Sequence, residues 1–430
     1  MTSTPTTTTT TSPKAPKAPA APTARKTIRR QMSLPVVLLL VAAGLVLFSA
    51  VRVVTGAHDL TSDGQAAAAL QLAVPVGLAG LGGLWAERAG VVNIGLEGMM
   101  ILGTWCGAWA GYQWGPWVGV LVGVLGGALG GLTHAVVTVT FGVNHIISGV
   151  AINILAGGAT QYLSRLAFDG VQGGTPVQSP NIDPLPRWTV PHLADWLTDI
   201  NREHWFLVSD LAGLCGGLVR DISALTVIAV TLVPLSFLVL WRTPFGLRLR
   251  SCGEAPVAAE SLGVNVYLYK YIGVITSGAL AGLGGVFLAE VTADFYREGQ
   301  TSGRGYIGLA AMIFGNWRPG GLAMGAGLFG FTDSLRLRNN DNVRALLLLL
   351  AVLLVLLALW QLYRRSYLAA SFSVVFGAGS AVWYVLSDEV PAEFIQAAPY
   401  LTTLLVLAFS SQRLRMPKAD GIPYRRGEGT

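Results

Sequence analysis

The feature that most constrains this chain is a succession of long apolar runs, several of which reach the ~20 residues needed to cross the hydrocarbon core of a bilayer. In lipid, a helix satisfies its own backbone polar groups, so the predicted fold class is an all-α polytopic membrane protein. We expect spans at about 35–54, 66–84, 91–112, 117–141, 144–166, 222–241, 270–290, 345–362, 367–386 and 397–411.

Two shorter apolar runs, 305–316 and 320–335, flank a Gly-Asn-Trp-Arg-Pro-Gly turn and decide the number of spans. Counted separately they give about 12 segments, whereas one continuous span over 305–335 would reverse the sidedness of everything that follows. We predict about 10–12 transmembrane helices and prefer 12, because Arg364, Arg365 and the basic C-terminus then lie on the cytoplasmic side.

The two ends of the chain differ in composition from its apolar middle. Residues 1–30 are rich in Thr, Pro and Ala and end in the basic RKTIRR, which predicts a disordered cytoplasmic tail. Residues 31–412 then form the transmembrane domain, and 413–430 form a basic cytoplasmic tail. The longest polar connection, 167–220, is predicted to lie outside; its apolar piece, 206–219, is too short to span and is expected to be re-entrant or interfacial.

Composition excludes several classes of function. Only 12% of the residues are charged, and the net charge of +6 comes from arginines at helix ends and tails, as membrane orientation requires, so we expect no nucleic-acid partner. The three cysteines and five histidines are dispersed and predict no disulfide framework, no metal site and no cofactor. None of the five lysines follows a glycine, so the chain has no phosphate-binding loop for ATP.

A polar, basic island at 242–270 interrupts the apolar runs and is predicted to be cytoplasmic. Pro256 suits a first helical position and Gly263 the residue just past a helix end, so we expect a short helix over 256–262 on the inner face of the membrane. Ala258, Ala259 and Leu262 would give it one small apolar face. Such a helix has the shape that fits a groove in a partner protein. The alternative interpretation of 242–270 is an ordinary loop between two spans.

An internal echo indicates an inverted repeat. LAGLGG occurs at 78–83 and again at 280–285; NIGLEGMMILG (93–103) follows the first copy and YIGLAAMIFG (306–315) the second. By the span count the copies run through the membrane in opposite directions, which is a recurrent plan of transporters. Chance similarity of glycine-rich helices is the competing explanation.

Polar residues inside the apolar runs are the candidates for a solute path. Glu97 follows Asn93 by four residues, so both are expected on one helix face, and a carboxylate inside a span indicates function by default. A structural hydrogen bond or a salt bridge to Arg88 is the alternative for Glu97. A weaker set opens a later span and either lines the path or joins helices: Asn144, Ser148 and Asn153.

Five motifs in this order carry a resemblance to a known family: WAERAGVVNIGLEGMM (85–100), VNHIISGVAINILAGG (143–158), TPFGLRLRSCGEAPVAAESLGVNV (243–266), SGALAGLGGVFLAE (277–290) and GRGYIGLAAMIFGNWRPGG (303–321). They resemble permease subunits of bacterial ABC importers of the branched-chain amino acid and ribose class, and within it the nucleoside-importer branch. The closing GIPYRRGE (421–428) is similar to the same branch. The resemblance covers roughly 60–335 and the C-terminal end.

The resemblance implies a solute-conducting subunit of the bacterial cytoplasmic membrane, with both termini inside. It implies that 253–263 is a coupling helix seated in a separate ATPase, and it assigns the coupling role to Arg250, Gly253, Glu254, Pro256, Ala258, Ala259, Leu262 and Gly263. The implied partners are that ATPase, a second homologous permease and a substrate-binding lipoprotein outside; the implied solute is small and neutral, most closely a nucleoside.

The sequence departs from the family in two places, and other functions stay open. The runs 345–362 and 367–386 are expected to be insertions, and 190–220 lacks the family's usual external pattern. Simple sugars or branched-chain amino acids are alternative solutes. A proton-coupled secondary transporter would also explain inverted repeats and Glu97. A membrane-embedded enzyme is least favoured, because paired carboxylates, His-x-x-x-His and a nucleophile elbow are all missing from the sequence.

Overall fold

The computed structural model describes residues 34–335, 340–387, 391 and 414–427. The chain divides into two compact units, 1–45 and 46–430. The described part of the first unit is the beginning of α1 (Leu34–Thr55), and the fold below is that of the second. The described residues are mostly helical, with a two-stranded antiparallel sheet of β1 (Arg187–Trp188) and β2 (Ile222–Ser223). The predicted all-α polytopic fold class is confirmed.

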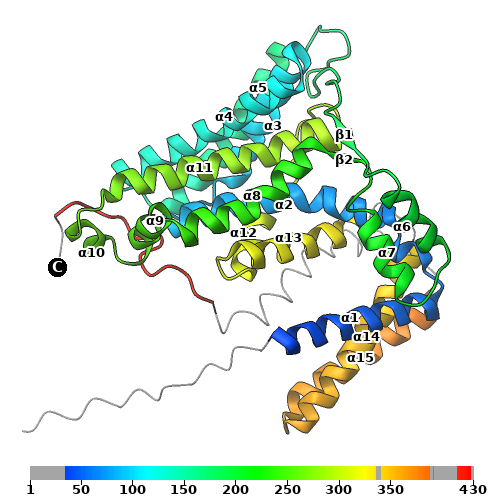
Figure 1. Ribbon diagram of the computed structural model, residues 1–430. Helices are drawn as coiled ribbons and strands as arrows, with labels where there is room; N and C mark the ends of the chain where they lie inside the picture. Colours follow the sequence, from blue (N-terminus) through cyan, green and yellow to red (C-terminus); the bar gives the residue numbers. More distant parts are fainter. Residues whose placement is uncertain (1–33, 336–339, 388–390, 392–413, 428–430) are drawn as a thin grey trace, which may run out of the picture. The chain divides into compact units, whose positions relative to one another are not determined.

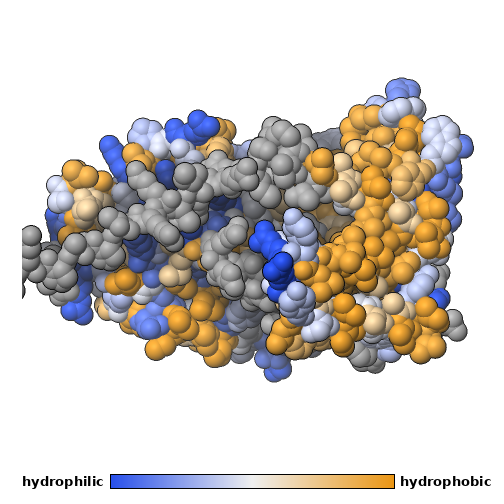
Figure 2. All heavy atoms as spheres, turned by 90° about the horizontal axis from the view of Figure 1, so that it is seen from below, coloured by the Kyte–Doolittle hydropathy of each residue, from blue (hydrophilic) through white to orange (hydrophobic). Residues whose placement is uncertain are grey.

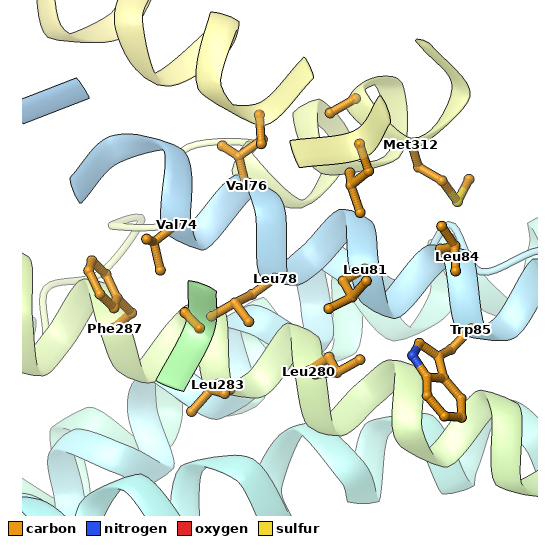
Figure 3. Close-up of a cluster of buried hydrophobic side chains, with 14 of the residues drawn as sticks. Val74, Val76, Leu78, Leu81, Leu84, Trp85, Leu280, Leu283, Phe287 and Met312 are labelled. Atoms are coloured by element: carbon orange, nitrogen blue, oxygen red, sulfur yellow. The ribbon is translucent and has the colours of Figure 1, made fainter. Parts of the chain in front are cut away.

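Two long helices form the centre of the second unit: α2 (Asp63–Arg88) and α11 (Val266–Phe287). They run antiparallel, because a Cβ on Gly82 would meet the carbonyl oxygen of Ser277 while one on Gly284 would meet that of Pro75. Figure 3 shows their buried side chains meeting along the crossing. The two LAGLGG copies therefore lie at one crossing and run in opposite directions.

The helices that flank this pair are exchanged between the two halves. Helices α3 (Leu96–Trp114) and α4 (Pro116–Ala135) pack on α11, whereas α12 (Arg304–Phe314) and α13 (Pro319–Ser334) pack on α2 (Figure 1). In each half of the repeat (α2–α4 and α11–α13), the two flanking helices therefore pack on the central helix of the other half. This is the arrangement that an opposed internal repeat predicts.

Glycines set the closest of these contacts. Gly127 and Gly131 of α4 face Gly278 and Gly282 of α11 so tightly that a Cβ on Gly127 would lie 2.3 Å from the carbonyl oxygen of Gly278. Helices in lipid gain little from hydrophobicity and associate through such small-residue faces. The glycine-rich echo in the sequence is therefore a packing surface as well as a repeat.

The two short apolar runs after residue 304 form a helical hairpin. Helices α12 and α13 run antiparallel, since Gly325 lies against Ala311 and Gly321 against Gly315. The turn between them holds Asn316 and Trp317 at positive φ. The expectation that 305–316 and 320–335 are separate segments is confirmed, although at 11 and 16 residues each is shorter than a full span.

The remaining helices surround this core. They are η1 (His58–Thr61), the π-helical turn η2 (Val136–Thr140), α5 (His145–Ala167), α6 (Leu193–Arg202), α7 (Val208–Gly216), α8 (Ala224–Arg242), α9 (Pro244–Glu254), α10 (Pro256–Ser261), the π-helical turn η3 (Leu288–Thr292), α14 (Asn340–Tyr363) and α15 (Tyr367–Leu386). The predicted short piece 206–219 contains α7, which packs on α6 and on α2.

Seven helices among the described residues are long and apolar enough to cross a membrane: 63–88, 116–140, 145–167, 224–242, 266–292, 344–363 and 367–386. Figure 2 shows hydrophobic side chains gathered where α14 and α15 lie. These two helices pack on each other and leave Leu356, Phe372 and Phe376 exposed, as lipid-facing helices do. The expected span at 397–411 and the tail at 1–30 lie outside the described residues.

Candidate functional site

The first candidate site is a break in the chain between α2 and α3. Residues 89–95 are not helical, and Gly90 has a φ of +82°. Side chains from three other helices take up the freed polar groups: Nδ1 of His145 accepts from the Val92 N–H, and Nε2 of His134 lies 3.0 Å from the Val92 oxygen. Asn93 donates to the Ser277 hydroxyl at 2.8 Å and accepts from the Gly95 N–H at 3.0 Å. Buried non-helical backbone is tolerated only where other protein groups satisfy its polar atoms.

This break overturns one expectation. Asn93 and Glu97 do not share a helix face, because α3 begins only at Leu96. The reason is local: the left-handed Gly90 ends the preceding helix, and the Asn93 side chain bonds its own backbone two residues on, which stabilises a turn instead of a helix.

Glu97 is buried at the start of α3 and binds the start of another helix. Its carboxylate accepts from the Gly303 N–H at 2.9 Å and from the Gly305 N–H at 2.7 Å, so it caps α12. A carboxylate is favoured there by the unsatisfied N–H groups and the positive end of the helix dipole. The alternative of a salt bridge to Arg88 is wrong, since Arg88 binds the Trp317 carbonyl oxygen and lies 3.9 Å from Glu254.

Of the other three predicted path residues, Asn153 and Ser148 make helix-joining contacts. Asn153 accepts from the Gly98 N–H at 2.7 Å and donates to the Tyr306 hydroxyl at 2.8 Å, which ties α5 to α3 and α12. Ser148 lies 2.9 Å from Nδ1 of His134. Asn144 is exposed and caps α5 by accepting from the Ile146 N–H. The structure therefore brings Asn93, Glu97, Ser148 and Asn153 to one junction, and their role in the path stays a prediction.

A cavity of about 240 Å³ adjoins this junction. Ile101 and Thr104 line it from α3 and Gly157, Thr160 and Gln161 from α5, with loop 296–301 closing one side. Ile101 follows Glu97 by four residues, and Gly157 follows Asn153 by four, so the cavity lies along the same two helix faces. Its lining offers hydroxyl, amide, guanidinium and carboxylate groups, which can bind a solute rich in hydrogen-bonding groups.

Glu290 is a residue of this region that the sequence reasoning missed. It lies in the π-helical turn η3, is 1% exposed, and neither carboxyl oxygen has a hydrogen-bond partner. Gly111 and Gly119 make room for it: a Cβ on Gly119 would come within 2.1 Å of Oε1. An acidic residue near the end of the apolar run 270–290 was the available signal, and π-turns are frequent at functional sites.

The second candidate site is the loop that joins α8 to α11. The predicted short helix is confirmed as α10, with Pro256 at its first position and Gly263 at a φ of +81° just past its end. The sequence reasoning missed α9, which precedes it. Its signal was Thr243 and Pro244, because the Thr243 hydroxyl caps the helix at the Gly246 N–H and proline suits the first turn.

Helix α9 packs on the ends of α8 and α2. Arg250 donates to the Leu240 carbonyl oxygen at 2.8 Å and lies over the Trp241 ring. A Cβ on Gly253 would lie 2.4 Å from the Arg88 carbonyl oxygen, so this position requires a glycine. These contacts fix the orientation of α9, and α10 follows it directly in the chain.

The apolar face expected of α10 is wrong in one respect. Ala259 is buried, whereas Ala258 is exposed and Leu262 is 85% exposed. Ala258 and Leu262 are four residues apart and lie on the same exposed side, whereas Ala259 directly follows Ala258 and is turned about 100° away from it. The outer surface of α10 therefore carries Val257, Ala258 and Leu262, and Ala259 anchors the helix from beneath.

The chain matches known proteins over most of its length. Residues 65–359 match the family model described as branched-chain amino acid transport system / permease component, and this match ends inside α14. The chain is 34% identical to the guanosine ABC transporter permease protein NupQ of Bacillus subtilis, covering 84% of this chain and 96% of that protein.

Two further relatives are similarly complete. The nucleoside ABC transporter permease protein NupC of Lactococcus lactis is 32% identical, over 81% of this chain and 93% of its own length. The putative glucose ABC transporter permease protein TsgC13 of Haloferax volcanii is 30% identical, over 84% and 96%. No solved structure gives a significant match.

Proposed function

Because the chain belongs to the family of branched-chain amino acid transport system permease components, we propose that it conducts nucleosides through the membrane in an ATP-driven importer. The observation that carries the proposal is the 34% identity to a guanosine permease across 96% of that protein's length. The second relative is also named for nucleosides, which supports this solute class.

The energy for transport is proposed to come from a separate ATPase. The sequence has no Gly-Lys-Ser/Thr phosphate loop, so another subunit must bind the nucleotide. We assign the docking of that ATPase to α9 and α10, with Val257, Ala258 and Leu262 outermost. A second permease and an external binding protein complete the proposed assembly.

The solute path is proposed to pass through the cavity between α3, α5 and loop 296–301. Asn93, Glu97, Ser148 and Asn153 hold the broken helices that frame it, and Asn144 fixes the start of α5. A nucleoside is neutral and carries many donors and acceptors, and its flat base stacks well on an aromatic ring. Tyr296 in the cavity wall supplies such a ring.

A sugar is the second candidate solute, because one relative of comparable coverage is named for glucose. Hydroxyl and amide groups in the cavity would serve a sugar equally well. Base stacking distinguishes a nucleoside from a sugar as the solute. Tyr296→Leu should raise the KM for a nucleoside several-fold more than Tyr296→Phe, because Tyr296→Phe keeps the aromatic ring.

The proposal is tested in proteoliposomes that hold this chain with an ATPase, a second permease and a binding protein of the proposed assembly. Uptake of radiolabelled guanosine, glucose and leucine is measured with ATP inside, against an ATPase whose phosphate-loop lysine has been replaced. Guanosine uptake that depends on the intact ATPase supports the proposal. Uptake that needs no ATP and collapses with a proton ionophore overturns it.

The cavity has its own test. Gln161→Ala removes an amide from the lining, and Gln113→Ala removes an exposed amide outside it. One lost hydrogen bond of 0.5–1.5 kcal/mol corresponds to a rise in KM of about twofold to tenfold for Gln161→Ala and none for Gln113→Ala. Equal KM values in the two variants would show that the solute does not bind in this cavity.

A further inference from the structure

The C-terminal segment 414–427 returns to the loop that joins α8 to α11. The Ala419 N–H donates to the Gly253 carbonyl oxygen at 2.9 Å, just before α10 begins. Arg426 pairs with Glu260 of α10 at 3.2 Å, and the ring of Tyr424 packs against that of Tyr267. The segment therefore contacts the last turn of α9 and the last turn of α10.

A buried carboxyl group seats this segment. Asp420 is 7% exposed, and neither of its oxygens has a hydrogen-bond partner of ordinary geometry. It lies beside the carboxyl of Glu87 at the end of α2, and Glu87 in turn accepts from the Trp317 indole N–H. Lys270 of α11, which donates to the Gly90 carbonyl oxygen at 3.0 Å, is also close enough to act on it.

This environment favours the neutral form of the Asp420 carboxyl. Burial, followed by the charge of Glu87, raises the pKa of Asp420 to about 9, with Lys270 opposing. Two adjacent carboxyl groups are stable together when one keeps its proton. A protonated Asp420 can donate a hydrogen bond to Glu87, which an ionised one cannot.

Helix α10 needs an external support. It has six residues, which is too short to hold a helix alone. Its anchor Ala259 packs with Cys252 and Val266, and Tyr424 of the C-terminal segment packs against this cluster. Arg426 and Tyr424 also close one side of a cavity of about 160 Å³ at the C-terminal end of α10.

We propose that residues 414–427 form a strap, seated by Asp420, that holds α9 and α10 in the orientation in which they meet the ATPase. This inference rests on the proposed function, since it assumes that α9 and α10 are the docking element. Asp420 is a positioning residue: it acts on α10 through the strap. The strap keeps Ala259 inside, and Val257 and Leu262 remain free for the partner.

The first experiment measures the strap on the full chain alone, by amide hydrogen exchange in detergent micelles. Asp420→Ala removes the seat, and Asp420→Asn keeps the shape and a donor for Glu87. Lys418→Ala changes an exposed side chain of the same segment and serves as the control. We expect amides 253–261 to exchange about tenfold faster in Asp420→Ala, because a backbone hydrogen bond and a packed cluster are lost, and at the native rate in the other two.

The second experiment measures guanosine-stimulated ATP hydrolysis by the assembled importer. Coupling should fall at least fivefold in Asp420→Ala and be retained in Asp420→Asn and Lys418→Ala, while the exchange of α4 and α5 amides stays native in all three. Retained coupling in Asp420→Asn, with native exchange in α4 and α5 of Asp420→Ala, distinguishes a positioning role of Asp420 from unfolding of the chain. Deletion of 414–430 should reproduce Asp420→Ala.

Native exchange of α10 in Asp420→Ala and in the deletion overturns the strap, whatever the chain transports. Faster exchange with intact coupling also overturns it, because the strap would then hold a segment that transport does not use. Failure of the proposed function is visible separately, as a wild-type assembly without guanosine-stimulated ATP hydrolysis.

Discussion

The cap that Glu97 places on α12 gives a quantitative prediction. In Glu97→Gln the side chain keeps its volume and one acceptor oxygen, but its NH₂ group turns toward one of the two glycine N–H groups that the carboxylate bound. A hydrogen bond to a charged group is worth ~1.5–3 kcal/mol, so this variant should lose about that much stability. Glu97→Ala leaves both N–H groups unmet and should lose ~3–6 kcal/mol.

The assay is equilibrium unfolding of the purified chain in mixed micelles, followed through tryptophan fluorescence. Glu203→Gln is the matched control, because Glu203 is exposed and its substitution should change stability by less than ~0.5 kcal/mol. The expected order is wild type, Glu203→Gln, Glu97→Gln and Glu97→Ala, from most to least stable. If Glu97→Ala unfolds with the wild type, the cap does not stabilise α12 and the reasoning is refuted.

Transport by the same variants separates two functions. In an ATP-driven importer of a neutral solute, Glu97→Gln should lower uptake only modestly and Glu97→Ala severely. In a proton-coupled transporter Glu97→Gln should abolish accumulation, since the titratable group is gone. A dead Gln variant together with ATP-independent, ionophore-sensitive uptake would contradict the importer.

Three further predictions follow from the same contacts. The purified chain alone should neither bind nor hydrolyse ATP, and saturable binding of a fluorescent ATP analogue would contradict this. Seating of the strap should weaken as pH rises: the pKa of Asp420 when seated is about 9, above its ordinary value of 3.8, so the stabilisation is full below about pH 4 and lost as pH rises to about 9. The rate of amide exchange in α10, corrected for intrinsic rates, should therefore rise between pH 6 and 9 in the wild type and rise less in Asp420→Asn. The other ionisable groups that face Asp420 are Glu87, Arg88 and Lys270. Deletion of 345–386 should leave uptake intact if the chain still inserts, because the exposed faces of α14 and α15 are apolar; a subunit-interface position for these helices would contradict it.

The parts of the fold that could be predicted depend on local pattern. Apolar run length located seven of the ten expected long spans, since the bilayer imposes that length whatever the neighbours are. Pro256 and Gly263 marked α10 because helix ends have specific backbone requirements. The repeated LAGLGG indicated the opposed halves, because close helix packing needs small residues at fixed spacing.

The parts that could not be predicted depend on partners far away in the chain. The groups that Glu97 binds lie 206 and 208 residues later, and no local pattern around Glu97 indicates them. The backbone of Val92, in the break that follows Gly90, is bound by His134 and His145, which lie 42 and 53 residues later. In the sequence, nothing distinguishes Asp420 from other residues of the C-terminal tail; only the tertiary fold shows that it is buried beside Glu87.

The central claim is that this chain conducts nucleosides for a separate ATPase. The most direct test is guanosine accumulation in proteoliposomes of the assembled importer, compared with and without internal ATP and with and without a proton ionophore. The account predicts accumulation that requires ATP, ignores the ionophore and is outcompeted by adenosine more strongly than by glucose or leucine. Accumulation without ATP that the ionophore abolishes would contradict it.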